Sequence, residues 1–179
     1  MIGPLYHGSD ASDRETLSFA EQSDRVVLAT VGSSGDVTRL AFLTRLEGCR
    51  IIVASASPPG YRVVVCSIVL PIDSLLPHVD VLVSHGGNGS ILQALAHGVR
   101  SVCLTSMFEQ EWNARRVDVL GVGTWLEPGN TDDQAVACVR EWMDGKGEGR
   151  LGEWSERIDV DQTKRNFRKL FEEWTAARR

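Results

Sequence analysis

The residues with the clearest capacity for chemistry lie in two short loops of small side chains. The segment HGGNGS, residues 85–90, joins an apolar run to an amphipathic segment, and VGSSGD, residues 31–36, occupies a similar place earlier in the chain. Glycine lets backbone N–H groups approach a ligand closely, and the N-terminus of a following helix attracts anions. Two such loops at one edge of a sheet predict a site for a nucleotide diphosphate.

His85 is the most specific of these residues. A histidine at the end of a strand can donate a hydrogen bond to a phosphate oxygen, and its charge changes near neutral pH. A lone histidine is usually structural, however, and neither loop has the spacing of an established phosphate motif: GSSGD carries no lysine, and GGNGSIL has leucine in place of a third glycine. The loops alone therefore leave a structural role open.

The elements around these loops alternate between strand and helix patterns. Helical patterns begin at Asp36, Gly89 and Glu109, and several of them end in glycine. Between them lie runs that are apolar at successive positions, which is typical of strands covered on both faces in a parallel sheet. This alternation predicts an α/β fold with a doubly wound parallel sheet, which binds ligands at the carboxyl ends of its strands. The predicted strands are residues 25–31, 50–55, 61–66, 79–84, 101–106 and 121–126.

The last third of the chain reads as mainly helical. TDDQAVACVREWMDG predicts a helix capped by Thr131, residues 144–153 (DGKGEGRLGE) predict a glycine-rich break, and residues 160–179 predict a closing helix. One stripe of the closing helix is apolar, and we expect it to pack on the core of this chain, with a partner surface as the alternative. Its members are Phe167, Leu170, Phe171 and Trp174.

Composition limits the class of protein. The chain has 179 residues, a formal net charge of −5 and no apolar run of membrane length, which predicts one soluble, cytoplasmic domain without a broad nucleic-acid surface. Residues 1–24 read as a linker-like segment and a helix that enter this domain. The cysteines are far apart and lack metal spacing, so we expect buried thiols rather than a disulfide or a zinc site: Cys49, Cys66, Cys103 and Cys138. The tryptophans are scattered, and we expect packing roles for Trp112, Trp125, Trp142, Trp154 and Trp174.

A long segment around the second loop resembles a known family. Residues 75–123 contain an LLP turn, HGGNGS, a helix, GV, and EQEWNARRV before LGVG, an order similar to the C-terminal half of GT-B glycosyltransferases. The similarity is particular to bacterial enzymes that glycosylate macrolides and other natural products, as in antibiotic biosynthesis, and to UDP-glycosyltransferases. IGPL near the start resembles the linker into this half. The resemblance implies that residues 1–179 form a Rossmann-like donor-binding half that binds a UDP-sugar or a dTDP-sugar.

The resemblance implies that both loops bind the diphosphate. His85 would contact it and stabilise the leaving group, because prearranged donors and a helix dipole can neutralise the charge that grows as the sugar C1–O bond breaks. No metal and no other cofactor is then required. The other residues implied at the diphosphate are Ser33, Ser34, Gly35, Gly87, Asn88, Gly89 and Ser90.

Other segments are implied to bind the base and the sugar. Glu109 and Gln110 would hold sugar hydroxyls, with exposed first-turn positions on their helix as the alternative. We expect Asn113 to brace the loop rather than touch substrate. The residues implied to frame the base are Pro71, Ile72 and Asp73, with the backbone of Ile72 bonding uracil or thymine.

The sequence departs from the family at three places. Gln93 stands where relatives usually have a glutamate that binds the ribose hydroxyls, and an amide lacks the charge that strengthens such bonds. Arg100 replaces the proline expected after HGV. CLTSMF lacks the proline expected before Glu109, so we expect a looser loop there.

The acceptor-binding half of such an enzyme normally supplies the catalytic histidine base. His7, His78 and His97 do not match that base by motif, so we expect no catalytic residue in this half beyond His85. The chain should therefore bind a nucleotide sugar and support inverting transfer to a small-molecule acceptor only beside an acceptor-binding N-terminal domain or a separate chain. It would be an excised domain, a natural subunit or a degenerate stand-alone protein. The alternatives are a non-catalytic nucleotide-sugar-binding module or regulatory subunit, and half of a nucleotide-sugar epimerase.

Overall fold

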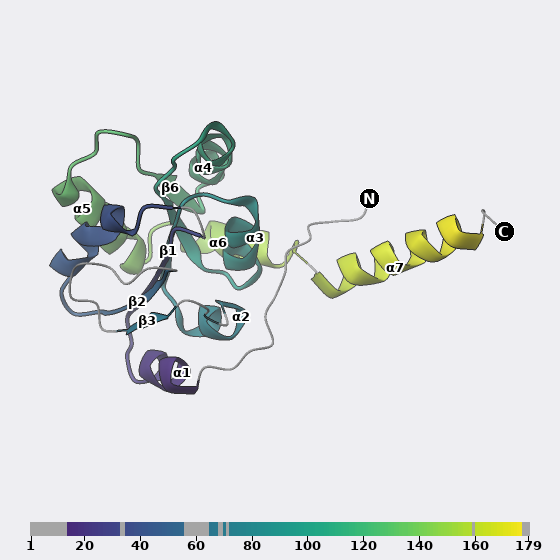
Figure 1. Ribbon diagram of the computed structural model, residues 1–179, viewed down its shortest axis with the longest axis horizontal. Helices are drawn as coiled ribbons and strands as arrows, with labels where there is room; N and C mark the ends of the chain where they lie inside the picture. The colour runs from purple at the N-terminus through teal and green to yellow at the C-terminus, as the bar shows by residue number, and fades with distance from the viewer. Residues whose placement is uncertain are drawn as a thin grey trace.

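Six parallel strands form one sheet in the order β3-β2-β1-β4-β5-β6 (Figure 1). The computed structural model describes residues 14–32, 35–55, 65–67, 70, 72–158 and 160–176. The predicted doubly wound α/β fold is confirmed, and each predicted strand overlaps an observed one, although residues 61–64 lie outside the described residues. The strands are β1 (Val26–Thr30), β2 (Arg50–Ala54), β3 (Val65–Ser67), β4 (Val81–Ser84), β5 (Arg100–Cys103) and β6 (Gly123–Trp125).

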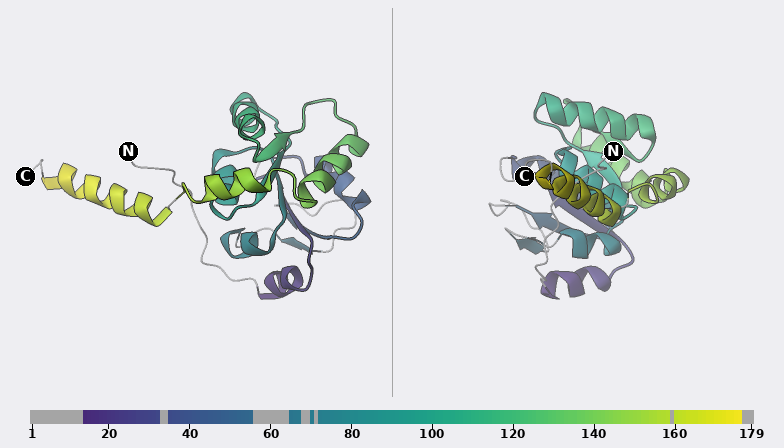
Figure 2. Two further views of the ribbon diagram at one scale, coloured as in Figure 1. Left: turned by 180° about the vertical axis from the view of Figure 1, so that it is seen from behind. Right: turned by 90° about the vertical axis from the view of Figure 1, so that its right-hand side faces the viewer.

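Helices cover both faces of this sheet (Figure 2). Side chains alternate along a strand, so Val27 and Ala29 face one side whereas Val26 and Leu28 face the other, and all four are fully buried. The first face packs against η1, a 3-10 helix (Val37–Arg45), and α5 (Asp132–Met143). The second packs against α1 (Arg14–Glu21), α2 (Ile72–Leu75), η2 (Leu76–His78) and α3 (Asn88–Ala96).

A third apolar cluster extends the second layer beyond α3. It joins α3 and β5 to α4 (Phe108–Leu120) and α6 (Glu148–Ser155). The helices predicted from Gly89 and Glu109 are confirmed as α3 and α4, and α4 ends at Gly121 with a left-handed φ of 68°. The predicted cap of α5 is also confirmed, because the Thr131 side chain accepts a hydrogen bond from the Gln134 N–H in a capping box.

The glycine-rich break predicted at residues 144–153 is shorter than expected, because α5 ends at Met143 and α6 already begins at Glu148. Leu151 is only 3% exposed and packs in the cluster that also contains Leu95. Burial of one large side chain therefore outweighs the low helix propensity of Gly149 and Gly152.

The closing helix α7 (Val160–Ala176) forms as predicted but projects away from the sheet and its covering helices (Figures 1 and 2). Its apolar stripe remains exposed, with 50% exposure at Phe167, 45% at Leu170, 55% at Phe171 and 51% at Trp174. The expected packing of this stripe on the core is therefore wrong for the part of the chain that is described. The alternative, a surface for a partner, is consistent with this exposure.

The tryptophans divide between core and surface. Trp142 is buried and donates a hydrogen bond from Nε1 to Thr124 Oγ1 at 2.8 Å, and Trp125 and Trp154 pack partly buried in the third cluster. Trp112 on α4 is 63% exposed, and Trp174 on α7 is 51% exposed. The predicted packing role is thus wrong for these last two.

Three cysteines are free thiols, as expected. Cys103 is fully buried, and this burial raises its pKa to about 12. Burial also raises the pKa of Cys49 and of Cys138, which are partly exposed. The side chain of Cys66 lies outside the described residues. None of the described helices is long and apolar enough to cross a bilayer.

Candidate nucleotide-binding site

The two predicted loops meet where the order of strands reverses. β1 and β4 are neighbours in the sheet, with Thr30 paired to Ser84 at their carboxyl ends. The chain then leaves in opposite directions, to β2 on one side and to β5 on the other. In doubly wound sheets this switch point opens a crevice for ligands. Both glycine-containing loops therefore border the position where this fold binds nucleotides.

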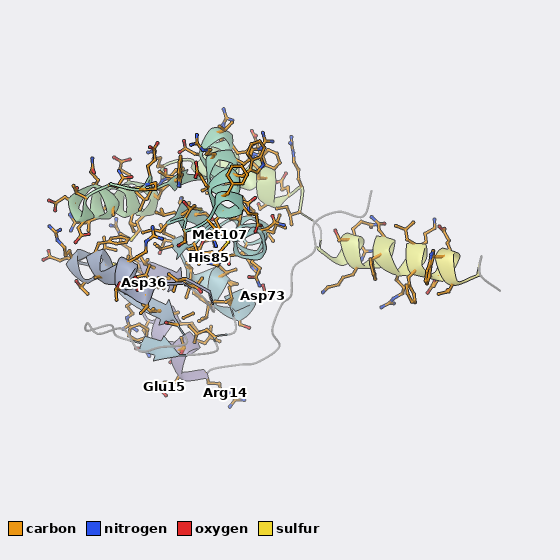
Figure 3. All side chains as sticks on the ribbon, turned by 45° about the horizontal axis from the view of Figure 1, so that its top comes forward. Arg14, Glu15, Asp36, Asp73, His85 and Met107 are labelled. Carbon is orange, nitrogen blue, oxygen red and sulfur yellow. The ribbon has the colours of Figure 1, made fainter. Side chains whose placement is uncertain are left out.

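The imidazole of His85 lies between the two loops (Figure 3). A Cβ added to Gly32 would lie 3.0 Å from Cε1 of His85, and one added to Gly87 would lie 2.6 Å from its Nε2. At Gly32 a left-handed φ of 68° already favours glycine, whereas at Gly87 glycine makes room for the ring. The close contact fixes the ring beside the backbone of both loops.

The first loop has a structural reason for one further glycine. A Cβ on Gly35 would lie 2.1 Å from the carbonyl oxygen of Val31, so the turn closes only with glycine. Asp36 then caps η1 by accepting hydrogen bonds from Thr38 N at 2.9 Å and from Thr38 Oγ1 at 2.7 Å, which lowers the pKa of its carboxyl group. Ser33 and Ser34, predicted at the diphosphate, lie outside the described residues.

His85 occupies a partly dry environment. Its Nδ1 is buried and has no hydrogen-bond partner among the residues described. Burial lowers the pKa of His85 below its usual value of 6.5, whereas the nearby Thr30 backbone and the Glu109 charge act in the opposite direction. The ring is therefore mainly neutral at pH 7, and an anion placed beside it would favour the protonated form.

The N-terminus of α3 provides backbone donors beside this ring. Its N-cap, Gly87, has no side chain to bond the first-turn N–H groups, and the first helical bond runs from Ile91 N to Gly87 O. Asn88 and Gly89 are exposed and Ser90 is partly exposed. The first-turn N–H groups have no intrahelical acceptors and carry the positive end of the helix dipole, so this end of α3 attracts an anion.

Asn113 braces the second loop, as predicted. Its Nδ2 donates to the carbonyl oxygen of Gly86 at 3.2 Å, and the Gly86 N–H bonds Ser84 Oγ at the same distance. Gly86 has a φ of 81°, a conformation that favours glycine. The loop is thus held from α4 on one side and from β4 on the other.

The predicted sugar-binding pair occupies two different environments. Glu109 is exposed in the first turn of α4, within 3.5 Å of Asn113 Nδ2. Gln110 is 6% exposed, and its Oε1 accepts a hydrogen bond from Ser106 N at 2.8 Å. The amide oxygen of Gln110 is therefore engaged within the loop, and contact of either residue with a sugar stays a prediction.

Arg39 is a positioning residue that the sequence analysis missed. Its Nη1 donates from η1 to Ser106 Oγ at 2.8 Å, Thr105 O at 3.0 Å and Leu104 O at 3.4 Å. It thereby ties the first loop region to the loop that lacks the expected proline. A single arginine without a motif gives no signal of this role in the sequence.

A polar contact joins α2 to α3 near the expected base site. Gln93 donates from Nε2 to Oδ1 of Asp73 at 3.2 Å, and His97 Nε2 lies 3.8 Å from the same oxygen. Ile72 is partly exposed beside them, and Pro71 lies outside the described residues. The structure thus places Gln93 and Asp73, predicted to contact different parts of the nucleotide, in direct contact.

Comparison with known proteins agrees with this fold. Residues 43–159 match the family model described as erythromycin biosynthesis protein CIII-like, C-terminal domain. Among curated relatives, a demethyllactenocin mycarosyltransferase from Streptomyces fradiae is 39% identical over 72 residues, which make up 40% of this chain and 16% of that protein.

Solved glycosyltransferases share the fold. The structure of Phytolacca americana UGT2 complexed with UDP-2fluoro-glucose and pterostilbene matches with a TM-score of 0.79 at 20% identity, covering 97% of this chain and 48% of the other. The glycosyltransferase SsfS6 from Streptomyces sp. SF2575, complexed with thymidine diphosphate, matches with a TM-score of 0.71 at 20% identity. The match covers 94% of this chain and 47% of SsfS6. The chain thus spans less than half the length of these two GT-B glycosyltransferase structures.

Proposed function

Since this chain belongs to the family of erythromycin biosynthesis protein CIII-like C-terminal domains, we propose that it is the donor-binding half of a glycosyltransferase and binds a UDP-sugar or a dTDP-sugar. One observation carries this proposal: the His85 ring lies between Gly32 and Gly87, beside the N-terminus of α3, at the switch point of the sheet. A buried ring nitrogen, close backbone and uncapped helix N–H groups there make a site suited to a diphosphate.

The diphosphate would lie against the first turn of α3. The N–H groups of Asn88, Gly89 and Ser90 would donate to its oxygens, and the Ser90 hydroxyl and Asn88 amide offer further donors. His85 would donate from a ring nitrogen, and the negative charge of the diphosphate would favour its protonated form. A metal ion is not required in this arrangement, because the helix end and His85 supply the positive potential.

The same contacts would assist sugar transfer. An acceptor oxygen attacks C1 of the sugar from the face opposite the diphosphate, the C1–O bond breaks, and the bonding electrons leave with the diphosphate, which inverts the anomeric centre. Donors that gain strength as this charge grows lower the barrier. The base that removes the acceptor proton would come from the acceptor-binding half, so we expect the chain alone to bind donor without transferring its sugar.

The nucleotides named for two solved relatives support a pyrimidine donor. UDP-2fluoro-glucose is bound to one and thymidine diphosphate to the other. Uracil and thymine differ by one methyl group, a difference that a pocket discriminates by about 1–3 kcal/mol. We therefore propose that this site binds a pyrimidine nucleoside diphosphate, and that the base alone does not decide between UDP and dTDP.

The partner would be an acceptor-binding half, in the same polypeptide or in a separate one. The exposed stripe of α7 offers two phenylalanines, a leucine and a tryptophan on one helix face, a typical composition for an interface centre. At the start of α4, Met107, Phe108 and Trp112 are 53%, 80% and 63% exposed. Both surfaces fit burial against a second half of similar length to this one.

A cytoplasmic location is part of the proposal. The thiols of Cys49, Cys103 and Cys138 are free, which fits a reducing compartment. The sugar donors that we propose are also compatible with natural-product glycosylation in that compartment.

Calorimetric titration of the purified chain with UDP, dTDP and ADP tests the proposal. Binding of a pyrimidine diphosphate with a Kd near 1–100 μM, roughly −8.2 to −5.5 kcal/mol, is expected together with much weaker binding of ADP. Absence of binding by both pyrimidine diphosphates would overturn it. A non-catalytic module would bind equally well but fail to transfer sugar when mixed with an acceptor-binding half, which an assay of glycosylated product distinguishes.

A further inference from the structure

Asp73 presents a carboxylate at the same edge of the sheet as His85 (Figure 3). It lies in the first turn of α2, and its side chain is 25% exposed. Gln93 of α3 and His97, the C-cap residue of that helix, face a single oxygen of this carboxylate: Gln93 Nε2 lies 3.2 Å and His97 Nε2 lies 3.8 Å from Oδ1. The side chain is therefore oriented by α3, although it belongs to α2.

The second oxygen of this carboxylate is available to a ligand. Within the described part of the chain, Oδ2 of Asp73 has no hydrogen-bond partner, because both contacts involve Oδ1. A carboxylate can accept several hydrogen bonds, so Oδ1 also keeps capacity beyond its contact with Gln93. Asp73 can thus accept from two donor groups at once.

The distance along α3 matches the length of a nucleotide. Gln93 lies one turn after Gly89, which is about 6 Å along the helix axis at 1.5 Å per residue. In a nucleoside diphosphate the ribose is the next group after the α-phosphate. If the diphosphate lies against the first turn of α3, the ribose hydroxyls fall near Gln93 and its partner Asp73.

The two hydroxyls of a ribose need acceptors, and a carboxylate is a stronger acceptor than an amide. In dinucleotide-binding folds an acidic side chain takes this role toward the ribose. The amide of Gln93 already directs its N–H toward Asp73. The carboxylate at this place in the site therefore comes from α2, while α3 contributes the amide that holds it.

We propose that Asp73 accepts hydrogen bonds from the ribose hydroxyls of the bound nucleotide, and that Gln93 and His97 are positioning residues for its carboxylate. This inference rests on the proposed donor-binding function. It makes Asp73 a determinant of the nucleotide sugar: UDP offers a 2′-hydroxyl and a 3′-hydroxyl, whereas dTDP offers only the 3′-hydroxyl. Asp73 therefore favours UDP over dTDP.

The test compares UDP and dTDP affinities in wild type and in Asp73→Asn by calorimetry. Loss of the charged acceptor should weaken UDP binding by roughly 10- to 100-fold and dTDP binding by a smaller factor. Because the ratio of the two affinities is measured on one sample, partial loss of folded protein does not change it. Asp118→Asn is the matched control, since Asp118 is an exposed carboxylate on α4, and its ratio should equal that of wild type.

A second experiment exchanges the carboxylate at position 73 with the amide at position 93. Gln93→Glu places a second carboxylate beside Asp73, so repulsion should weaken UDP binding by about 3- to 10-fold. The double variant Asp73→Asn with Gln93→Glu restores one carboxylate and one amide, and should recover UDP affinity to within about fivefold of wild type.

Three outcomes would overturn the inference. Asp73→Asn that keeps the wild-type ratio of UDP to dTDP affinity would show that position 73 does not bind the ribose. Gln93→Glu that binds UDP more tightly than wild type would show that the ribose acceptor is placed by position 93 and not by position 73. A wild-type chain that binds neither nucleotide would overturn the proposed function and this inference with it. The first two outcomes leave donor binding intact, so the two failures are distinguishable.

Discussion

The ring of His85 packs against Gly87 so closely that a Cβ on Gly87 would lie 2.6 Å from Nε2. Gly87 is also the N-cap of α3, with φ of −65° and ψ of 141°, a conformation open to any residue. Glycine is therefore required there because of the histidine and not because of the backbone. This relationship couples the position of His85 to the helix end that we propose binds the diphosphate.

Gly87→Ala should move His85 out of place while leaving the fold intact. The added methyl group meets the ring, so we expect a loss of UDP affinity of about 1–2 kcal/mol, because a displaced ring loses part of one charged hydrogen bond. Gly152→Ala is the matched control, because a Cβ there has open space and α6 should gain about 0.5–1 kcal/mol of stability. Calorimetry and thermal unfolding measure both effects, and equal UDP affinity in the two variants would contradict the coupling.

His85→Ala should weaken UDP binding by about 1.5–3 kcal/mol, the range for a hydrogen bond to a charged group. The same variant should bind uridine, which lacks phosphate, as the wild type does. Titration with both ligands separates the two effects. An unchanged Kd for UDP would remove His85 from the diphosphate site.

The pH dependence of stability should report the burial of His85. Burial lowers the pKa of His85 in the folded chain below its usual value of 6.5. Above about pH 6.5 the ring is neutral in both states, and the stability that neutral His85 contributes is fully present. As the pH falls below about 6.5, the unfolded chain takes up the proton before the folded chain does. The free energy of unfolding therefore decreases until the pH has fallen below the folded pKa. Urea unfolding between about pH 7.5 and pH 5 should show a steeper loss for wild type than for His85→Gln. Parallel curves would contradict this assignment.

Arg39→Met should loosen the loop after β5. It removes the donors to Leu104 O, Thr105 O and Ser106 Oγ, at an expected cost of about 1–2 kcal/mol in unfolding free energy. Hydrogen exchange at the backbone of residues 104–110 should become faster.

Arg45→Met is the control on the same helix for that loop experiment. Arg45 is 49% exposed and pairs with Asp133 and Asp132 at the surface, so its removal should cost less than about 1 kcal/mol. Equal destabilisation by the two variants, with unchanged exchange at residues 104–110, would show that Arg39 does not position the loop.

The strands and the two glycine-containing loops were predictable because each is indicated by residues that are neighbours in the sequence. Runs such as residues 25–31 are apolar at successive positions, and the sheet buries both faces of β1. His85 stood out because it follows such a run directly. The order of strands, which brings Thr30 beside Ser84 and so joins the two loops, follows from packing between distant segments and has no local signal.

Contacts between distant elements account for what was missed. The stripe of α7 has the same pattern whether it packs on its own chain or on another, so sequence could not decide its partner. Burial of Leu151 stabilises α6 in spite of its glycines. The Asp73 contact with Gln93 joins residues 20 positions apart, and neither residue alone indicates it.

The most direct test of the central claim is a nitrogen NMR spectrum of the histidine rings recorded during a UDP titration. His85→Gln identifies the signals of His85 among those of the four histidines. We expect UDP to shift the signals of the His85 ring nitrogens and to raise the pKa of His85, because the diphosphate favours its protonated form, whereas uridine should leave this pKa unchanged. If UDP binds and the His85 signals and pKa stay the same, the diphosphate lies elsewhere and the proposed donor site is wrong.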